Sequence, residues 1–177
     1  MNKKKYNGNI MDEDDKMKNI IKIILPCLFL FFLIGCNLNN TPTSKVEEKL
    51  SNYQMLDKKI NDDIDAGVQL LASYDQDNNI KNSTYKKLVT KQYKNIVYEV
   101  KEEVIDGDNA TITVEIEVLD YRKITDDNIN DTLLKQLENT KEKVTYSIDF
   151  YVIKDNDGNW NLSEIDDITL SKILGLY

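Results

Sequence analysis

Apolar side chains recur at helical spacing in the segment that follows residue 44. They stand three or four positions apart as far as Tyr74, which is the period of one face of an α-helix. Ser44, followed three residues later by Glu47, has the form of a capping box and predicts that a helix begins there. A break is expected around residues 57–61, and a second stripe predicts a helix that ends near Lys94. The two stripes consist of Val46, Leu50, Tyr53, Ile60, Ile64, Val68 and Leu71, then Tyr85, Leu88, Val89 and Tyr93.

The period of the apolar pattern changes to two after residue 95. Apolar and polar residues alternate in segments 110–118 and 144–152, which predicts strands with one apolar face and one solvated face. A strand that begins at Ile96 is expected to reach the first of them through the turn DGDN at residues 106–109. The residues expected to be buried by the sheet are Ile112, Val114, Ile116, Ile148, Phe150 and Trp160.

Turn and helix signals account for the remaining segments. The stretch DNDGN at residues 155–159 predicts a turn into a last strand, which carries Trp160. Helices are expected at residues 127–140 and, as a short closing element, at residues 169–175. Helices first, then antiparallel hairpins with an inserted helix, predict an α+β fold in which N-terminal helices pack on a curved antiparallel sheet.

An apolar run of about fifteen residues, from Ile20 to Ile34, precedes this domain. The run is shorter than the roughly 20 residues that a helix needs to cross a bilayer. Lys18 and Lys22 stand at its beginning and small residues at its end, which is the order of a secretory signal peptide. Residues 1–35 are therefore predicted to be a signal peptide.

The run ends in Leu33, Ile34, Gly35 and Cys36, which resemble the lipobox of bacterial lipoproteins. In a lipobox the cysteine sulfur takes a diacylglyceryl group, and the small residue before it lets the signal peptidase approach the bond. The resemblance implies that Cys36 is lipidated and becomes the mature N-terminus. It also implies that the protein is lipid-anchored at the extracytoplasmic face of the cell membrane. The alternative is that Cys36 ends an uncleaved anchor.

The segments on either side of the apolar run complete the predicted organisation. Four acidic residues at positions 12–15 precede it, where a signal peptide carries positive charge, so translation from Met17 is one hypothesis beside starts at Met1 and Met11. After the run, the lipidated cysteine and a flexible polar tether are assigned to residues 36–43, and the single domain to residues 44–177.

Three segments of the predicted domain carry a resemblance to a known fold: KVEEKLSNYQMLD, KQYKNIVYEVKEEVIDGDNATITVEIEVLDY and DNDGNWNL. Over residues 44–168 their order resembles the nuclear transport factor 2-like, or cystatin-like, fold. This resemblance implies a curved sheet that wraps the N-terminal helices into a cone. Behind a lipobox, the same segments look like small secreted lipoproteins of Gram-positive bacteria.

Composition limits the chemistry of the mature domain. The chain has no histidine, which excludes Ser-His-Asp catalysis, Cys-His catalysis and His-ligated zinc. Cys27 lies in the signal peptide, so a disulfide is not expected, and no cofactor motif is present. Residues 1–35 hold six of the 23 basic and four of the 31 acidic residues, which leaves 17 and 27 and a net charge of −10. Nucleic acid and anionic lipid head groups are therefore not expected as partners.

Two acidic segments have part of the spacing of a calcium loop. In the first, four residues match positions 3, 5, 6 and 12, but Ile153 at position 1 cannot ligate a cation, which favours a hairpin turn. They are Asp155, Asp157, Gly158 and Glu164. The second segment lacks the glycine and has a lysine at the last position; its residues are Asp75, Asp77, Asn79 and Lys86. No metal site is predicted.

Some enzymes of the resembled fold place an acid and a tyrosine inside the cone for proton transfer. The nearest candidates are Asp149 with Tyr146 and Tyr151, and Asp120 with Tyr121. Along its strand Asp149 lies on the face opposite that of Tyr146, Ile148 and Phe150, and it is therefore expected to point to solvent. The ten tyrosines are interpreted as half-buried sheet and helix residues rather than as a ligand cage.

These observations favour a membrane-anchored extracytoplasmic lipoprotein whose domain is a non-enzymatic binding or interaction module. One alternative is a protein that holds a small apolar ligand in the cone cavity, and another is an enzyme that uses that cavity. The expected partners are the membrane, through the lipid on Cys36, and a protein at the cell surface. A filled cavity would favour surface interaction, an open apolar cavity a ligand, and a buried carboxylate facing it an enzyme.

Overall fold

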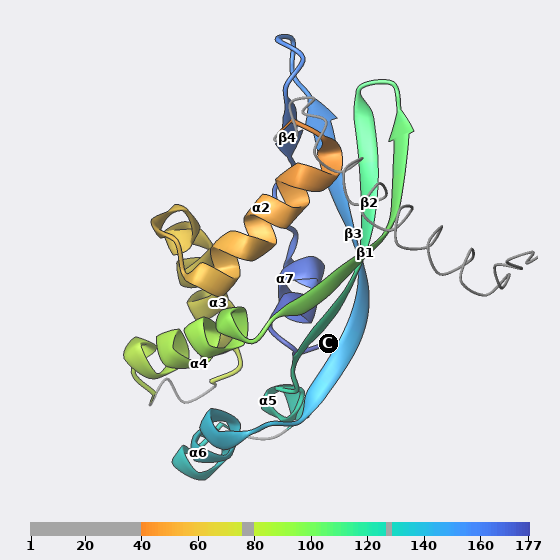
Figure 1. Cartoon of the computed structure of the whole chain (residues 1–177). Coiled ribbons are helices and arrows are strands. Elements are labelled where there is room, and N and C mark those ends of the chain that lie inside the picture. The colour runs from red at the N-terminus through yellow and green to blue at the C-terminus, as the bar shows by residue number, and fades with distance from the viewer. Residues whose placement is uncertain (1–39, 76–79, 127–128) are drawn as a thin grey trace, which may run out of the picture. The chain divides into compact units, whose positions relative to one another are not determined.

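The computed structural model describes residues 40–75, 80–126 and 129–177 of the chain (Figure 1). The predicted signal peptide, the lipobox and the first part of the tether lie outside the described residues. Asp77 and Asn79 of the second acidic segment lie outside them as well.

Six α-helices, one short 3-10 helix and four strands make up the described part of the chain. The fold class is α+β, as predicted from the order of the two periodicities. In chain order the elements are α2 (Pro42–Met55), η2 (Lys58–Ile60), α3 (Asn61–Ser73), α4 (Asn82–Lys94), β1 (Val97–Asp106), β2 (Asn109–Leu119), α5 (Lys123–Asp126), α6 (Asp131–Asn139), β3 (Lys143–Lys154), β4 (Trp160–Leu162) and α7 (Asp167–Ile173).

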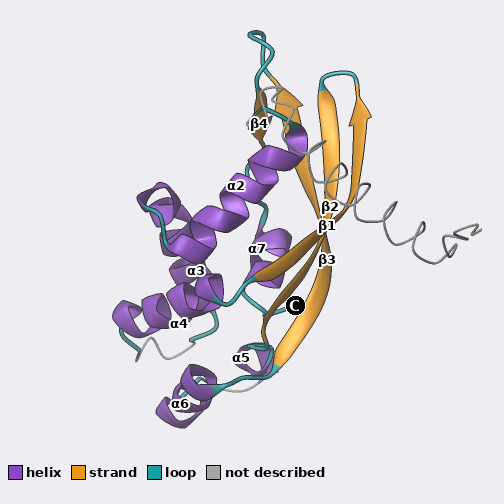
Figure 2. Ribbon diagram, in the orientation of Figure 1, coloured by secondary structure: helices purple, strands orange, loops and turns teal. Residues whose placement is uncertain are grey.

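The four strands form one antiparallel sheet in the order β1-β2-β3-β4, so strands that follow each other in the chain also pair. Ile112 of β2 lies opposite Phe150 of β3, and Val114 lies opposite Ile148. A bulge between Val100 and Glu102 shifts the register of the edge strand β1. Figure 2 shows that the sheet is curved and that the helices gather on one side of it.

The core lies between the inner face of the sheet and helices α2, α3, α4 and α7. The six residues predicted to be buried by the sheet are all buried, which confirms the inward face assigned to β2, β3 and β4. Gly67 of α3 brings two helices close together, because a Cβ atom there would lie 3.1 Å from Cγ1 of Val89 on α4. A side chain at this position would require the Val89 side chain to shift by a few tenths of an ångström.

The first helix begins two residues earlier than the predicted cap at Ser44. Thr41 is the N-cap, and its hydroxyl accepts the backbone N–H of Ser44 while the Ser44 hydroxyl accepts that of Thr41. The proline ring of Pro42 suits the first turn, because this position has no helical partner for an N–H group. The sequence predicts a flexible tether over residues 36–43, but residues 40–43 form a hydrogen-bonded cap and the start of the first helical turn. The pattern missed this because the capping box can also be formed by Thr41 with Ser44.

The predicted break near residues 57–61 is confirmed. Leu56 ends α2 in a left-handed conformation with φ of 51°, and the Asp57 carboxylate then accepts the N–H of Lys59 to start η2. The chain turns here, so α3 packs on α4 instead of continuing α2.

Candidate functional site

Tyrosine rings fill the space between the helices and the sheet. Tyr53 of α2 stacks on Tyr93 of α4 with ring centroids 4.3 Å apart. Tyr85 and Tyr121 are also fully buried, so the prediction of half-buried tyrosines is wrong for these four. Burial raises the pKa of all four hydroxyls, because an ionised phenolate would be desolvated there. The inner volume is thus occupied by the chain's own side chains.

The first predicted acid-tyrosine group does not come together. Asp149 is exposed on the outer face of the sheet, as predicted, and accepts a hydrogen bond from the Thr113 hydroxyl at 2.7 Å. Tyr151 lies on the same outer face, in the next inter-strand row. The Tyr146 hydroxyl instead donates to the backbone carbonyl of Tyr177 at 2.6 Å. This arrangement provides no acid and phenol around a common cavity.

The second predicted group is also divided between two environments. Nε and Nη2 of Arg122 donate to the Asp120 carboxylate at 3.0 and 2.6 Å. These contacts hold the pKa of Asp120 below its usual range. The Tyr121 ring is buried, and its hydroxyl makes no hydrogen bond with any described residue. Asp120 is therefore engaged in a surface ion pair with Arg122.

The acidic stretch DNDGN forms the hairpin turn that the sequence predicted. One carboxylate oxygen of Asp155 accepts the backbone N–H groups of Asp157 and Asn159, and the other accepts Nδ2 of Asn161. Gly158 takes a φ of 83°, which favours glycine. These hydrogen bonds lower the pKa of Asp155. Among the residues that the structure describes, no three acidic side chains are grouped to hold a metal ion.

Two of the three buried polar side chains of the described residues, Gln92 and Asp75, make hydrogen bonds that the sequence does not predict. Gln92 is fully buried on α4 and bonds both backbone groups of Leu119, with Nε2 donating at 2.7 Å and Oε1 accepting at 2.9 Å. Asp75 is buried too, and it accepts hydrogen bonds from the Ile80 N–H and the Tyr85 hydroxyl, each at 3.0 Å. The signal for Gln92 was its place in the apolar stripe of its helix. Both side chains are occupied by structural hydrogen bonds.

Two surface hollows lie at the edges of the domain. One of about 700 Å³ lies beside α5 and α6, and one of about 430 Å³ lies between α2 and the segment around β4. Most lining residues of both hollows have charged or amide side chains, and apolar side chains accompany them, among them Leu137 in the first and Ile60 and Ile165 in the second. The first is lined by Asp120, Lys123, Gln136, Leu137, Asn139, Thr140, Lys141 and Glu142, and the second includes Lys45, Glu48, Lys49, Asn52, Lys59, Asp63, Trp160 and Glu164. Such linings suit water and polar partners better than an apolar ligand.

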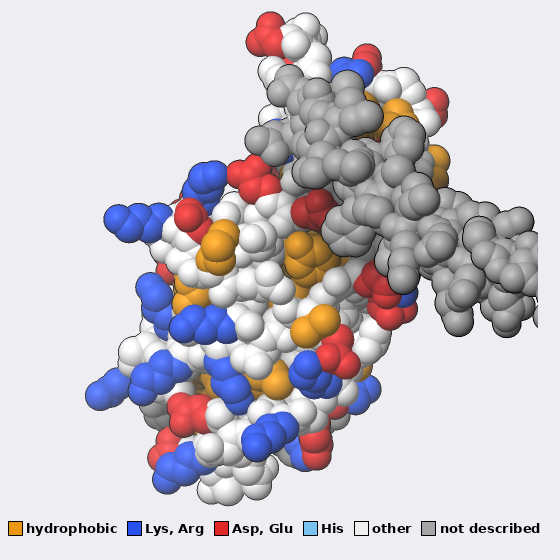
Figure 3. Space-filling model, in the orientation of Figure 1, with side chains coloured by type: hydrophobic (Ala, Val, Ile, Leu, Met, Phe, Trp, Pro, Cys, Tyr) orange, Lys and Arg blue, Asp and Glu red, His pale blue; other side chains and the backbone are white. Residues whose placement is uncertain are grey.

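Helix α4 is basic although the chain as a whole is acidic, with a net charge of −8. It carries four lysines and no acidic residue, and Figure 3 shows Lys and Arg side chains over this side of the domain. The Lys91 side chain caps the C-terminal end of α6, because its Nζ donates hydrogen bonds to the backbone carbonyls of Leu137, Glu138 and Thr140. Burial lowers the pKa of Lys91. The other three lysines of α4 appear in no ion pair among the described residues.

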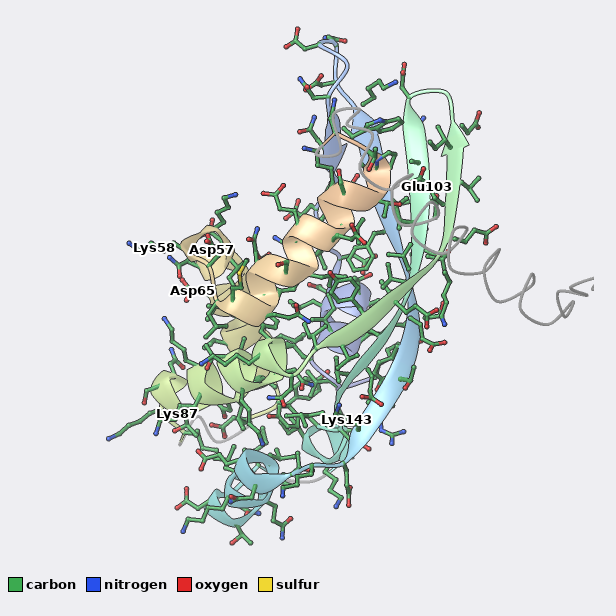
Figure 4. The ribbon with its side chains drawn as sticks, in the orientation of Figure 1. Asp57, Lys58, Asp65, Lys87, Glu103 and Lys143 are labelled. Atoms are coloured by element: carbon green, nitrogen blue, oxygen red, sulfur yellow. The ribbon has the colours of Figure 1, made fainter. Side chains whose placement is uncertain are left out.

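The opposite end of the domain, which we call the hairpin end, consists of the β1–β2 turn, the β3–β4 turn and the start of α2. The Lys154 N–H donates to the Asp108 carbonyl at 2.8 Å and so joins the two turns. The backbone N–H of Thr43 on α2 donates to the Glu103 carboxylate of β1 at 3.1 Å, and its hydroxyl donates to the same oxygen (Figure 4). The helix dipole also stabilises a carboxylate at the N-terminus of a helix. These bonds make the hairpin end one connected structure.

Large apolar side chains are exposed at the hairpin end. Val104, Tyr151 and Ile153 lie on the outer face of the sheet, with 52%, 58% and 50% of their surfaces exposed. Val104 and Tyr151 both lie opposite Thr111, one on each side. Ile105 faces the inner side and is also exposed. An exposed apolar cluster of this kind is a candidate contact surface.

Comparisons with models of protein families, with curated proteins and with solved structures find no match for this chain. Among the described helices, none combines the length and the apolar content that a bilayer-spanning helix requires.

Proposed function

We propose that the chain is a lipoprotein held at the extracytoplasmic face of the cell membrane by the lipid on Cys36, and that its α+β domain is a non-enzymatic binding or interaction module. One observation carries the second part of this proposal: among the described residues, buried side chains pack together between the helices and the sheet. Tyr53 and Tyr93 stack there, and Phe150 of the sheet is buried in the same cluster. The surface is what remains available to a partner.

The filled interior favours this function over the two alternatives. A small apolar ligand inside the cone, or an enzyme that uses the cone, needs open space beneath the helices. Asp149 is exposed on the outer face of the sheet, and buried Asp75 already accepts hydrogen bonds from Ile80 and Tyr85. The curved sheet behind N-terminal helices supports a cystatin-like cone as the detailed fold. The net charge of −10 after residue 35 supports a protein partner and no nucleic acid.

The anchor is tested by substituting the two cysteines of the chain separately. In a bacterial host that processes lipoproteins, Cys36→Ser leaves an unprocessed precursor without labelled palmitate, because a hydroxyl cannot take the diacylglyceryl group. The matched control is Cys27→Ser, which lies inside the predicted signal peptide and leaves both palmitate labelling and processing intact. Palmitate on the Cys36→Ser protein, with cleavage after Gly35, would refute the lipobox assignment.

The module is tested with the soluble chain that begins at Asn37. Titration with an apolar fluorescent probe such as N-phenyl-1-naphthylamine is expected to show no saturable site, because the interior has no room for it. Saturable binding of one probe per chain would support the ligand-binding alternative.

Photo-crosslinking from exposed positions on intact cells then identifies the partner. We expect crosslinks from the surface and none from a buried position such as Ile116.

A further inference from the structure

We propose that the hairpin end rests against the lipid bilayer, with Val104, Tyr151 and Ile153 at the level of the head groups. The inference rests on the proposed lipidation of Cys36 and goes beyond it, because it states which surface of the domain faces the membrane. Three observations carry it: where the chain enters the domain, how short the connection to Cys36 is, and which side chains are exposed there.

The chain enters the domain at the β3–β4 turn. Nδ2 of Asn40 donates to the Gly158 carbonyl at 3.3 Å, and Oδ1 of Asn40 accepts the Trp160 N–H at 2.9 Å. Thr41 follows at once as the cap of α2. The side-chain amide of Asn40 thus pairs with the edge of β4 as a neighbouring peptide group would, and it fixes the first described residue to the hairpin end.

The connection from Cys36 to this fixed point is short. Asn40 follows Cys36 by four positions. Four residues span at most about 14 Å even when fully extended. A diacylated cysteine stays at the membrane surface, because two chains hold far more firmly than one. Asn40 must therefore lie within about this distance of the bilayer surface, and the hairpin end is bonded to it through Gly158 and Trp160.

The side chains exposed at this end suit the head-group region. Tyrosine is enriched at membrane interfaces because its ring is apolar and its hydroxyl is polar. Tyr151 and Ile153 project from the same outer face of β3, and Val104 lies two strands away, roughly 10 Å at the spacing of sheet strands. Because Lys154 joins the two turns through Asp108, these side chains keep their positions relative to Asn40.

The charges of the hairpin end determine which lipids it tolerates. Its two turns carry four aspartates, and the hydrogen bonds to Asp155 keep that carboxylate ionised. They are Asp106, Asp108, Asp155 and Asp157. Carboxylates are repelled by an anionic leaflet, and salt screens this repulsion. We therefore expect closer contact with zwitterionic than with anionic bilayers, and a smaller difference between them at high salt.

The test uses introduced cysteines as the only free thiols. Because lipidation consumes Cys36, the mature lipidated chain carrying Ile153→Cys has one thiol, which is labelled with an environment-sensitive nitrobenzoxadiazole probe. The control is Met55→Cys at the far end of α2, a 14-residue helix about 21 Å long. Met55 is also an exposed apolar residue, with 66% of its surface accessible. Both proteins are reconstituted into phosphatidylcholine vesicles.

The probe at position 153 is expected to shift its emission to the blue and to be quenched by brominated phosphatidylcholine, while the probe at position 55 does neither. Replacing a third of the lipid by phosphatidylglycerol at low salt is expected to weaken the quenching at position 153. Equal quenching at the two positions would overturn the proposal. So would a blue shift at position 153 that ignores brominated lipid and grows with protein concentration, because this would indicate a second copy on the same surface. Palmitate labelling, measured on the same samples, reports the anchor separately.

Discussion

Two isoleucines on the inner face of the sheet differ completely in burial. Ile116 of β2 is 0% exposed, whereas Ile105 of β1 is 52% exposed. Both belong to strands with partly alternating apolar residues, and both lie on the inner face according to the register of β1 with β2. Ile116 belongs to the core cluster that the helices and the sheet form together, whereas Ile105 is the second-last residue of β1 and lies beside the β1–β2 turn.

The difference between these residues shows what strand alternation can and cannot predict. Alternation assigns a residue to a face, because successive side chains point to opposite sides of a strand. Whether that face is covered depends on the lengths and positions of the helices. The domain therefore has a covered region, where side chains carry the stability, and an exposed hairpin end, where they are available for contact. Substitutions paired across the two regions test this division.

The largest effect is expected from a pair of glycines with positive φ. Gly175, with φ of 70°, lies in the covered region, where a Cβ atom would stand 2.0 Å from the Leu119 carbonyl oxygen and 2.6 Å from Nε2 of Gln92. Gly107, with φ of 62°, lies in the β1–β2 turn with nothing within 4 Å. Gly175→Ala should cost about 4 kcal/mol or more, because backbone must move. Gly107→Ala should cost only the left-handed penalty of about 1–2 kcal/mol.

Urea unfolding of the soluble chain measures both free energies. Equal losses for the two alanine variants would mean that the C-terminal segment does not pack on the end of β2, and would contradict the covered region as described.

The second prediction compares the two isoleucines directly. Ile116→Ala should lower the free energy of unfolding by about 3 kcal/mol, because it leaves a cavity in a packed core. Ile105→Ala should change it by less than about 0.5 kcal/mol, as is typical of an exposed site. The free energies are measured by urea unfolding, from the midpoint of each variant and from the slope of its free energy against urea concentration. A small loss at Ile116 would mean that the inner face has been assigned to the wrong side of β2.

Much of the fold could be predicted because its elements follow local rules. The change of period after residue 95, the glycine turns at Gly107 and Gly158 and the break near Asp57 each depend on neighbours in the chain. The start of α2 was misplaced because Ser44 can serve as a cap or as the third helical residue. The hydrogen bonds of Asn40 to the β3–β4 turn hold the residues that precede α2, and no local pattern could predict them because they join residues more than a hundred positions apart.

The candidate site was predicted less well, because it depends on contacts between distant elements. Alternation correctly placed Asp149 on the outer face. It gave no sign that Tyr85 and Tyr121 are fully buried, since burial of a tyrosine depends on what packs over its ring. Nor could it show that Asp75 would be buried with the hydroxyl of Tyr85 as its partner. Depth of burial, rather than choice of face, was the information that the sequence lacked.

The third prediction concerns the buried hydroxyl that has a partner. Tyr85→Phe removes the donor at 3.0 Å from the Asp75 carboxylate and leaves that buried group with its bond from Ile80. The free energy of unfolding should fall by about 1–3 kcal/mol, the usual cost of an unsatisfied buried acceptor. Thermal unfolding followed by circular dichroism is the measurement. An unchanged melting temperature would show that Asp75 is satisfied by other groups.

The smallest effect, of opposite sign, is expected at the buried hydroxyl without a partner. The Tyr121 hydroxyl makes no hydrogen bond with a described residue, so Tyr121→Phe should raise the free energy of unfolding by up to about 1 kcal/mol. Burial also raises the pKa of Tyr121 above its usual 10.0. The free energy of unfolding is therefore unaffected by this hydroxyl's ionisation below pH 10. It falls as the pH rises further, because Tyr121 loses its proton in the unfolded chain before it does so in the folded chain. Phenylalanine does not titrate. Urea unfolding should therefore show that the difference in free energy of unfolding between the Tyr121→Phe variant and the unsubstituted chain increases above pH 10. A destabilised Phe variant at neutral pH would mean that the hydroxyl has a partner after all.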